Sequence, residues 1–211
     1  MMVKKFVIGV FASNCYVVYC RDTKQAAFID PGFRNLQEAR DTILFVKQCE
    51  LDIKFIINTH GHPDHSAGNG LLKEEFQAPI CIHKDDAYML GDSGKETFRF
   101  FGFDGISPPA DILLNEGEYI KFGEVTLRVL HTPGHSQGSI TLIGETEIFT
   151  GDTLFAGSIG RTDFPGSSDY QMQLSLKKLA QLPDYYTVYS GHGPRTTIAQ
   201  EKNSNPFLDG I

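Results

Sequence analysis

The chain has 211 residues, of which 41% are hydrophobic and 21% are charged, and this balance excludes a disordered or fibrous protein. Its formal net charge is −7, with 19 Lys and Arg against 26 Asp and Glu and no basic run, so nucleic acid is not an expected partner. No apolar stretch approaches membrane-spanning length, and the first ten residues do not resemble a signal peptide. We expect a cytoplasmic protein with a single domain over residues 1–211, and its oligomeric state stays open.

In the first half of the chain, short β-rich segments lie between turn residues and predict strands. These strands are expected at residues 6–10, 16–20, 25–30, 54–58 and 79–83. Apolar residues at helical spacing predict helices over residues 35–49, 66–76 and 84–90. Cysteines 15, 20, 49 and 81 form no C-x-x-C pair, so we expect small buried hydrophobes in a reducing compartment.

Residues 91–115 form the least regular part, with several glycines and prolines. A short helix followed by a long loop that could cover a site is expected there, with the aromatic cluster Phe98–Phe103 as core or lid packing. In the second half, strands are predicted at residues 119–122, 125–130, 139–143, 147–150 and 187–190, and helices at 172–182 and 196–200. This order predicts an α/β fold in which two mixed sheets pack face to face with helices outside, an αββα sandwich.

The motif His60-Gly61-His62-Pro63-Asp64-His65 directly follows the predicted buried strand at residues 54–58. Side chains two residues apart in an extended segment point the same way, so His60 and His62 can bind one metal ion. Asp64 and His65 follow a proline, where the chain can turn, and can therefore face a second ion. The motif predicts a metal site at the end of a strand, where catalytic groups tend to lie.

Three more candidate ligands stand where a predicted strand gives way to a loop, each with a neighbouring glycine. They are His135, Asp152 and His192. With the motif, they give seven nitrogen or oxygen donors and no sulfur, which is too many for one closed structural zinc site. Such a set suits two adjacent ions that share a bridging carboxylate and a bridging hydroxide and leave positions open for substrate.

These motifs resemble those of the metallo-β-lactamase superfamily and are most similar to its glyoxalase II-like (hydroxyacylglutathione hydrolase-like) members. The resemblance runs from Asp30-Pro31-Gly32 to Gly191-His192-Gly193 and implies the αββα fold. By this resemblance, the first metal is held by His60, His62 and His135, the second by Asp64, His65 and His192, and both by Asp152.

Departures from other members narrow the expected activity. β-Lactamases of the commonest class replace the ligand at the position of His65 and carry cysteine at that of Asp152, so lactam hydrolysis is not expected. Residues 157–164 resemble the segment that follows the bridging aspartate in glyoxalase II-like hydrolases and in persulfide dioxygenases. In those families, the residue that corresponds to Arg161 anchors the glutathione carboxylate. A salt bridge with Asp163 is the alternative role for that arginine. The chain stops about where glyoxalase II begins its helical C-terminal domain, which leaves glutathione specificity open.

The resulting hypothesis is a binuclear metal-dependent hydrolase. It would cleave thioesters such as S-acyl-glutathione with a hydroxide that bridges two divalent ions, while Asp64 and Asp152 orient this nucleophile. Zinc is the expected metal, and iron or manganese suit the same donors. A persulfide dioxygenase with a single iron on His60, His135 and Asp152 is the alternative, and a lactonase is a further hydrolytic option.

For three other titratable residues, structural roles are considered beside functional ones. His83 and His131 lie in or at the end of apolar strands, so we expect hydrogen-bonded structural histidines, although His131 could also support a ligand. Asp30 is either an ordinary turn residue or a hydrogen-bond acceptor behind the ligands.

Overall fold

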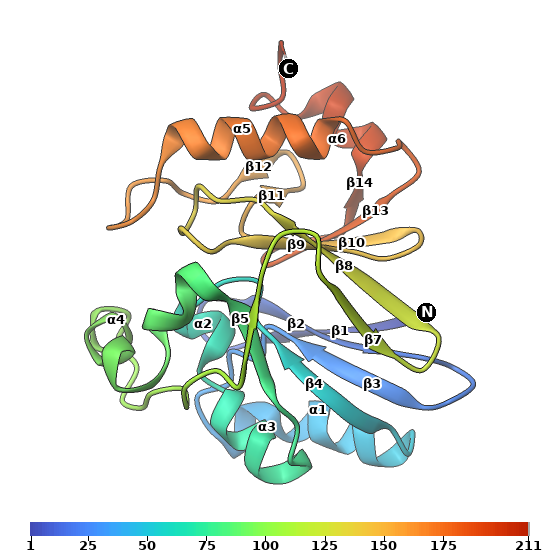
Figure 1. The fold of residues 1–211 in the computed structure, drawn as a ribbon, viewed down its shortest axis with the longest axis vertical. Helices are drawn as coiled ribbons and strands as arrows, with labels where there is room; N and C mark the ends of the chain where they lie inside the picture. Colours follow the sequence, from blue (N-terminus) through green and yellow to red (C-terminus); the bar gives the residue numbers. More distant parts are fainter. Residues whose placement is uncertain (211) are drawn as a thin grey trace.

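The computed structural model describes residues 1–210, in which two six-stranded sheets stack face to face. Figure 1 shows α1 and α3 outside one sheet and α5 and α6 outside the other. The predicted αββα arrangement of two mixed sheets is confirmed. Within the described chain, no helix is long and apolar enough to cross a membrane.

The first sheet is antiparallel from β1 to β3 and parallel from β3 to β6. Its strands, in spatial order, are β1 (Met2–Ile8), β2 (Ser13–Tyr19), β3 (Gln25–Ile29), β4 (Asp52–Ile57), β5 (Ile80–His83) and β6 (Ile112–Leu114). Helices α1 (Leu36–Gln48) and α3 (Asn69–Phe76) connect its parallel strands. The side chain of Asn35 caps α1 by accepting a hydrogen bond from the backbone N–H of Glu38.

The second sheet is antiparallel except where β10 pairs with β13. Its strands, in spatial order, are β14 (Thr196–Thr197), β13 (Thr187–Ser190), β10 (Glu147–Gly151), β9 (Ile140–Ile143), β8 (Val125–His131) and β7 (Tyr119–Phe122). Helices α5 (Asp169–Ala180) and α6 (Ile198–Ser204) cover it, and a small hairpin of β11 (Leu154–Phe155) and β12 (Ser158–Ile159) follows β10.

Strand β3 shows how the core is layered. Its alternate residues Ala26 and Phe28 pack with the helices on the outer face, and Ala27 and Ile29 pack with the second sheet. All four are fully buried, as expected for a strand covered on both faces. The rigid double layer therefore fixes where its strand ends, and the loops that follow them, point.

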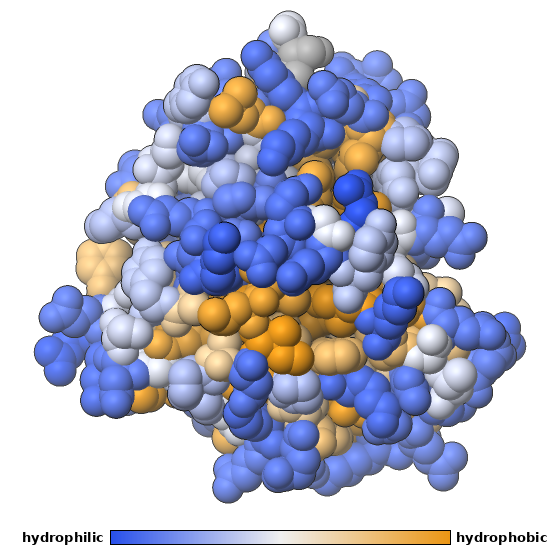
Figure 2. Space-filling model, in the orientation of Figure 1, coloured by the Kyte–Doolittle hydropathy of each residue, from blue (hydrophilic) through white to orange (hydrophobic). Residues whose placement is uncertain are grey.

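The edge strands β6 and β7 leave part of the molecule's apolar surface open. Figure 2 shows an apolar band across the middle of the face that Figure 1 presents. Strand β6 exposes Ile112 and Leu113, and β7 exposes Tyr119.

Several predicted boundaries were wrong for physical reasons. The strand expected at 6–10 ends at Ile8, because residues 9–12 turn the hairpin with Gly9 and Ala12 at positive φ. The helix expected at 66–76 is split into α2 (Pro63–Ser66) and α3, since Gly68 packs on Pro31, whose oxygen accepts its N–H at 2.6 Å. The short helix expected at 84–90 is present as the 3₁₀ helix η1 (Lys84–Met89), and the short helix expected after residue 91 is α4 (Lys95–Phe100), which follows a second 3₁₀ helix, η2 (Gly91–Gly94). Strand β6 and the β11–β12 hairpin fall where a loop was expected.

Candidate metal centre

The seven candidate ligands converge at one end of the two sheets, although they come from four loops. The motif follows β4 of the first sheet, whereas His135, Asp152 and His192 follow β8, β10 and β13 of the second. Among these seven residues, two groups can be drawn in which all ligand atoms lie within 4.8 Å of one another. The first triad is His60, His62 and His135, and the second triad is Asp64, His65 and His192.

The first triad consists of three buried imidazoles. His62 Nδ1 lies 2.8 Å from His135 Nε2. The ring centroid of His60 is 4.9 Å from that of each of the other two. This triad therefore offers three nitrogen donors around one point.

The second triad contains a carboxylate and reaches closer to solvent. His65 Nε2 lies 3.3 Å from Asp64 Oδ2 and 3.2 Å from His192 Nε2, and the latter nitrogen is 3.4 Å from the same carboxylate oxygen. The side chain of His192 is 27% exposed, while His65 is fully buried. This triad combines two imidazoles with one negative charge.

Asp152 lies between the two triads and touches both. Its Oδ2 is 3.5 Å from His135 Nε2 in the first triad and 3.5 Å from His192 Nε2 in the second. Its Oδ1 is 3.5 Å from His65 Nε2. One carboxylate therefore faces both groups of donors.

The donor atoms are spaced as ligands of metal ions would be. Two N or O ligands bound tetrahedrally at about 2.0–2.2 Å lie roughly 3.3–3.6 Å apart. The separations in the second triad are 3.2–3.4 Å, and those to Asp152 are 3.5 Å, whereas the His62–His135 pair is shorter at 2.8 Å. In addition, His60 Nε2 and Asp152 Oδ1 are buried without a hydrogen-bond partner among the described residues. Buried polar atoms are costly when unpaired, so these residues fit divalent cations.

Two residues of the first sheet and its loops, Asp30 and Thr59, form hydrogen bonds behind the candidate metal ligands. Asp30, left open by the sequence, is 1% exposed and accepts hydrogen bonds from the backbone N–H and the hydroxyl of Thr59, both at 2.7 Å. Its Oδ2 also lies 3.3 Å from His65 Nδ1, and the Thr59 hydroxyl is 3.1 Å from His60 Nδ1. Asp30 is therefore a hydrogen-bond acceptor behind the ligand candidates, which orients one imidazole in each triad.

Asp86 joins the two loops of the first triad, a role that sequence reasoning missed. This buried carboxylate accepts a hydrogen bond from the N–H of Gly61 at 2.9 Å. It also accepts from the Ser136 hydroxyl and the Gly138 N–H, both at 2.6 Å. Burial raises the pKa of Asp86, although these three donors oppose the shift. Asp86 thus ties the loop of His60 and His62 to the loop of His135.

Other contacts fix the remaining rings and the acidic member of the second triad. His135 Nδ1 lies 2.8 Å from the Arg161 carbonyl oxygen, and His192 Nδ1 lies 3.2 Å from that of Phe11. Those contacts direct Nε2 of both rings towards the centre. The Ser13 hydroxyl donates to Asp64 Oδ2 at 2.9 Å. Ser13 and Phe11 belong to the first hairpin, far from the motif in sequence, and no sequence pattern pointed to them.

The electrostatics of the two triads differ. Burial, aided by neighbouring histidines, holds the pKa of His60 well below its usual value and lowers that of His62 to about 3. Burial also opposes protonation of His192, but Asp152 and Asp64 outweigh it and raise the pKa to about 9. The same carboxylates raise the pKa of His65 well above its usual value despite its burial. His60 and His62 of the first triad are therefore uncharged at neutral pH, whereas the second triad retains positive charge.

The loop glycine Gly191 makes room for the central carboxylate. A Cβ at this position would stand 2.0 Å from Asp152 Oδ1 and 2.8 Å from His65 Cε1. No side chain can be accommodated there without moving the centre. This close approach explains why a glycine precedes His192.

A cleft of about 360 Å³ opens above the centre. His62, Asp64, His135, Asp152 and His192 form its floor, and its walls include the aromatic side chains of Phe11, Phe101, Phe155 and Phe164. The aromatic cluster was predicted to pack in the core or a lid, and its members differ in this respect. Phe98 and Phe103 are buried, whereas Phe101 lines the cleft.

Arg161 lines the same cleft and is paired with Asp163. Its guanidinium donates two hydrogen bonds to that carboxylate, at 2.6 and 2.7 Å, and lies 4.1 Å from the ring centroid of Phe164. Both charged side chains are more than half exposed. The salt bridge and the position in the cleft wall, which sequence reasoning set against each other, are thus compatible.

His83 and His131 lie outside the cleft lining. Their rings stack with centroids 4.2 Å apart, and His131 Nε2 is 2.8 Å from the Gln137 carbonyl oxygen. His83 Nδ1 accepts the backbone N–H of Asp85 at 3.3 Å. These contacts agree with the structural role predicted for both residues.

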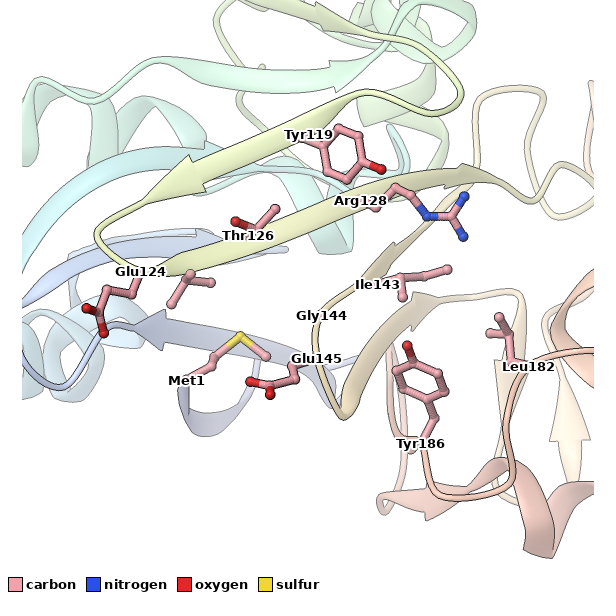
Figure 3. A pocket seen from close by; sticks show the side chains of 11 residues that line it. Met1, Tyr119, Glu124, Thr126, Arg128, Ile143, Gly144, Glu145, Leu182 and Tyr186 are labelled. Carbon is pink, nitrogen blue, oxygen red and sulfur yellow. The ribbon is translucent and has the colours of Figure 1, made fainter.

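A second hollow, of about 450 Å³, lies between the β7–β8 hairpin and the loop after α5. Figure 3 shows Tyr119 and Arg128 on one side of it and Leu182 and Tyr186 on the other. None of the seven candidate ligands lines this hollow. This hollow is therefore separate from the candidate metal centre.

Comparison with known proteins places the chain in a family. Residues 8–192 match the metallo-beta-lactamase superfamily. The hydroxyacylglutathione hydrolase GloC of Haemophilus influenzae is 38% identical over 215 residues, which cover 99% of this chain and 99% of that protein.

Solved structures agree with this placement. The BLEG-1 B3 metallo-beta-lactamase matches with a TM-score of 0.89 at 38% identity, covering 99% of this chain and 100% of the other. TTHA1623 in a di-iron-bound form matches with a TM-score of 0.85 at 33% identity, and the match covers 98% of this chain and 100% of the other. ETHE1 from Myxococcus xanthus matches with a TM-score of 0.83 at 29% identity, and the match covers 100% of this chain and 85% of the other.

Proposed function

Since the chain belongs to the metallo-beta-lactamase superfamily, we propose that it is a binuclear metal-dependent hydrolase that cleaves S-acyl-glutathione-like thioesters. The observation that carries this proposal is the position of Asp152, 3.5 Å from a histidine nitrogen of each triad. A carboxylate shared by two donor groups is the arrangement that two adjacent ions need.

The proposed ligands follow the two triads. His60, His62 and His135 would hold one ion, Asp64, His65 and His192 the other, and Asp152 both. Zinc is the proposed metal because three to four N and O donors suit it, and the di-iron form of TTHA1623 supports iron as well. Bound divalent ions would polarise a substrate carbonyl and lower the pKa of water to about 7.

The chain's own carboxylates position the water. Nearby histidines keep the pKa of Asp64 and Asp152 well below the usual value despite burial, so both are ionised at neutral pH. Asp152 Oδ1 is buried without a hydrogen-bond partner among the described residues and would be available to a bound ion. The Ser13 hydroxyl fixes Asp64 Oδ2 at 2.9 Å and so holds the second carboxylate in place.

The reaction balances with water alone. The water oxygen forms a bond to the carbonyl carbon, the C–S bond breaks, and the products are a carboxylate, a thiol and one proton released to solvent. A thiolate leaves readily, so the cleft needs no strong acid beside the sulfur. Four aromatic side chains in the walls of the cleft give the site an apolar surround.

The similarity to GloC, a hydroxyacylglutathione hydrolase, supports a thioester of glutathione as the substrate. Arg161 is the proposed anchor for a carboxylate of the thiol part, because its guanidinium stands in the cleft wall and is exposed. To bind substrate it would share or exchange its present partner, Asp163.

A persulfide dioxygenase is the second candidate, and the match to ETHE1 favours it. That reaction would use one iron on two histidines and one carboxylate, here His60, His135 and Asp152. The second triad would then have no role in holding metal, which is the point on which the two candidates differ.

One substrate panel tests the proposal. Protein loaded with zinc or with iron would be given S-lactoylglutathione, glutathione persulfide with an oxygen electrode, a lactone and a cephalosporin. Hydrolysis of the thioester at least ~100-fold faster than turnover of the others is expected. Oxygen uptake with the persulfide and no thioesterase activity would replace the proposal with the dioxygenase. Preferential opening of the lactone or the cephalosporin would also contradict it.

A further inference from the structure

An apolar pocket of about 330 Å³ adjoins the cleft on the side of the first triad. Its walls are Tyr88 and Met89 at the end of η1, Phe100 and Phe101 at the end of α4, and Phe164 and Pro165 after β12. Helix α4 protrudes at the left of Figure 1, beside α2, which carries Asp64 and His65. The pocket has a size at the small end of ligand sites, so it suits one chemical group of a ligand and not a whole one.

The pocket shares three wall residues with the cleft above the metal centre. His62, Phe101 and Phe164 line both the pocket and the cleft. The ring centroid of Phe101 lies 5.1 Å from that of His62, and the centroid of Phe164 lies 5.5 Å from it. A group that enters the pocket would therefore lie beside His62 of the first triad. The reacting carbonyl of a substrate would lie at that triad.

The walls favour an apolar occupant. Besides His62, the ionisable residues of the pocket are Glu96 and Tyr88, and neither carries positive charge. The guanidinium of Arg161 lines the neighbouring cleft but not the pocket, and it lies on the ring of Phe164. The carboxylates of a thiol such as glutathione would lose their hydration in the pocket without a positive partner, whereas an apolar acyl chain would gain from burial.

We propose that this pocket binds the acyl part of the substrate and makes the enzyme selective for thioesters with apolar acyl groups, such as hexanoyl or phenylacetyl. The selectivity rests on the proposed thioester hydrolysis. The thiol part extends past Arg161 on the polar side of the cleft. A small hydroxyacyl group such as lactoyl would leave the pocket unfilled and is the poorer substrate.

A chain-length series tests the proposal with the holoenzyme. The values of kcat/KM would be compared for the S-lactoyl, S-acetyl, S-butanoyl and S-hexanoyl derivatives of glutathione. Each fully buried methylene contributes a factor of about 4, so a rise of at least ~10-fold from acetyl to hexanoyl is expected even with partial burial. Values that stay flat or fall with chain length, or a preference for lactoyl, would overturn the proposal.

A matched pair of variants assigns the preference to the pocket. Phe100 is 71% exposed on the pocket rim, and Tyr119 is 61% exposed on β7, outside the cleft. Phe100→Asp is expected to reduce the hexanoyl-to-acetyl ratio at least ~5-fold, whereas Tyr119→Asp should leave this ratio unchanged. The ratio does not depend on the fraction of folded or metal-loaded protein. Equal ratios in wild type and Phe100→Asp would contradict the assignment.

Binding of thioethers separates this proposal from the proposed function, because thioethers are not hydrolysed. Calorimetry with S-hexylglutathione and S-methylglutathione should show tighter binding of the hexyl compound, by ~10-fold or more, and Phe100→Asp should remove the difference. If no thioester is cleaved but this difference is found, the hydrolase proposal fails and the pocket remains. If thioesters are cleaved and the two compounds bind equally or not at all, the pocket proposal fails. If there is neither cleavage nor binding, both proposals fail.

Discussion

The two triads of the candidate metal centre are built from similar residues but differ in charge and exposure. The first has three buried imidazoles, and burial lowers the pKa of His62 to about 3. The second includes Asp64, and the neighbouring carboxylates raise the pKa of His192 to about 9. The side chain of His192 is also 27% exposed.

This difference indicates how each triad would receive a cation. His60 and His62 of the first triad are uncharged at neutral pH, so a cation would enter beside them without displacing a positive charge. In the second triad a cation must displace protons, and the carboxylates supply the compensating negative charge. We therefore expect the first triad to be the tighter site at neutral pH and the second to be more sensitive to pH and easier to empty.

Removing the shared carboxylate should have the largest effect, because Asp152 contacts both triads. Asp152→Ala is expected to lower thioesterase activity at least ~100-fold and to reduce the metal content of both sites. Metal analysis and kinetics would be compared with Asp184→Ala, a change of an exposed carboxylate on the surface. Full activity in a metal-poor Asp152→Ala protein would contradict a metal-based mechanism.

Removing one histidine from each triad should separate the two sites. His62→Ala is expected to empty the first triad and to reduce activity more than His192→Ala does, by ~10-fold or more, because water can replace the partly exposed ligand more readily. Native mass spectrometry would count the ions bound to each variant. Equal losses of metal and activity would show that the two triads do not differ as proposed.

Asp86 should affect the first triad alone. Asp86→Ala leaves three buried donors without their acceptor, which costs about 1–3 kcal/mol for each donor that finds no water. The affinity of the first triad for zinc is expected to fall by ~10–100-fold, as it does for other groups that orient ligands. Competition with a chelator measures both sites, and Asp86→Asn, which keeps one acceptor oxygen, should lie between. Equal weakening of both triads would indicate a general loss of stability.

The metal-free protein should be most stable near pH 6.5, as far as His62 and His192 determine it. Between pH 3 and 6.5 the unfolded state binds a proton that His62 does not bind in the fold, so these conditions favour unfolding as the pH falls. Between pH 6.5 and 9 the folded state retains a proton on His192 that the unfolded state has lost, so stability decreases as the pH rises. Denaturation at several pH values measures how the free energy of unfolding changes on both sides of pH 6.5. His192→Gln should reduce the loss of stability between pH 6.5 and 9, and an unchanged loss would contradict the assignment.

Much of the fold could be predicted because local pattern and tertiary structure agree. The apolar run Lys54–Asn58 predicted a buried strand, and β4 lies at the middle of its sheet with Ile56 and Ile57 fully buried. Strand β6 and the β11–β12 hairpin were missed, because two- or three-residue strands are stabilised by their pairing partners and not by local propensity. The break at Gly68 depends on its contact with Pro31, which no helical pattern reveals.

The candidate ligands could be found from sequence because they follow strands and carry metal-binding groups in a specific motif. The structure adds the groups that hold them. Asp86 is 25 residues from Gly61 and 50 from Ser136, and Ser13 is 51 from Asp64, so only the fold brings these partners together. The sequence shows only an acidic residue shortly after the predicted strand at 79–83, and the burial of Asp86 is known from the structure alone. The lining of the pocket proposed to bind the acyl group comes from four separate segments and gave no sequence signal as a set.

The number of metal ions per chain tests the central claim most directly. Native mass spectrometry of the active protein, combined with elemental analysis, should find two divalent ions per chain. Chelation should remove both together with the thioesterase activity, and adding back the metal should restore the activity in step with the second ion. A fully active protein with one ion per chain, unchanged by a second equivalent, would contradict the account of two triads joined by Asp152.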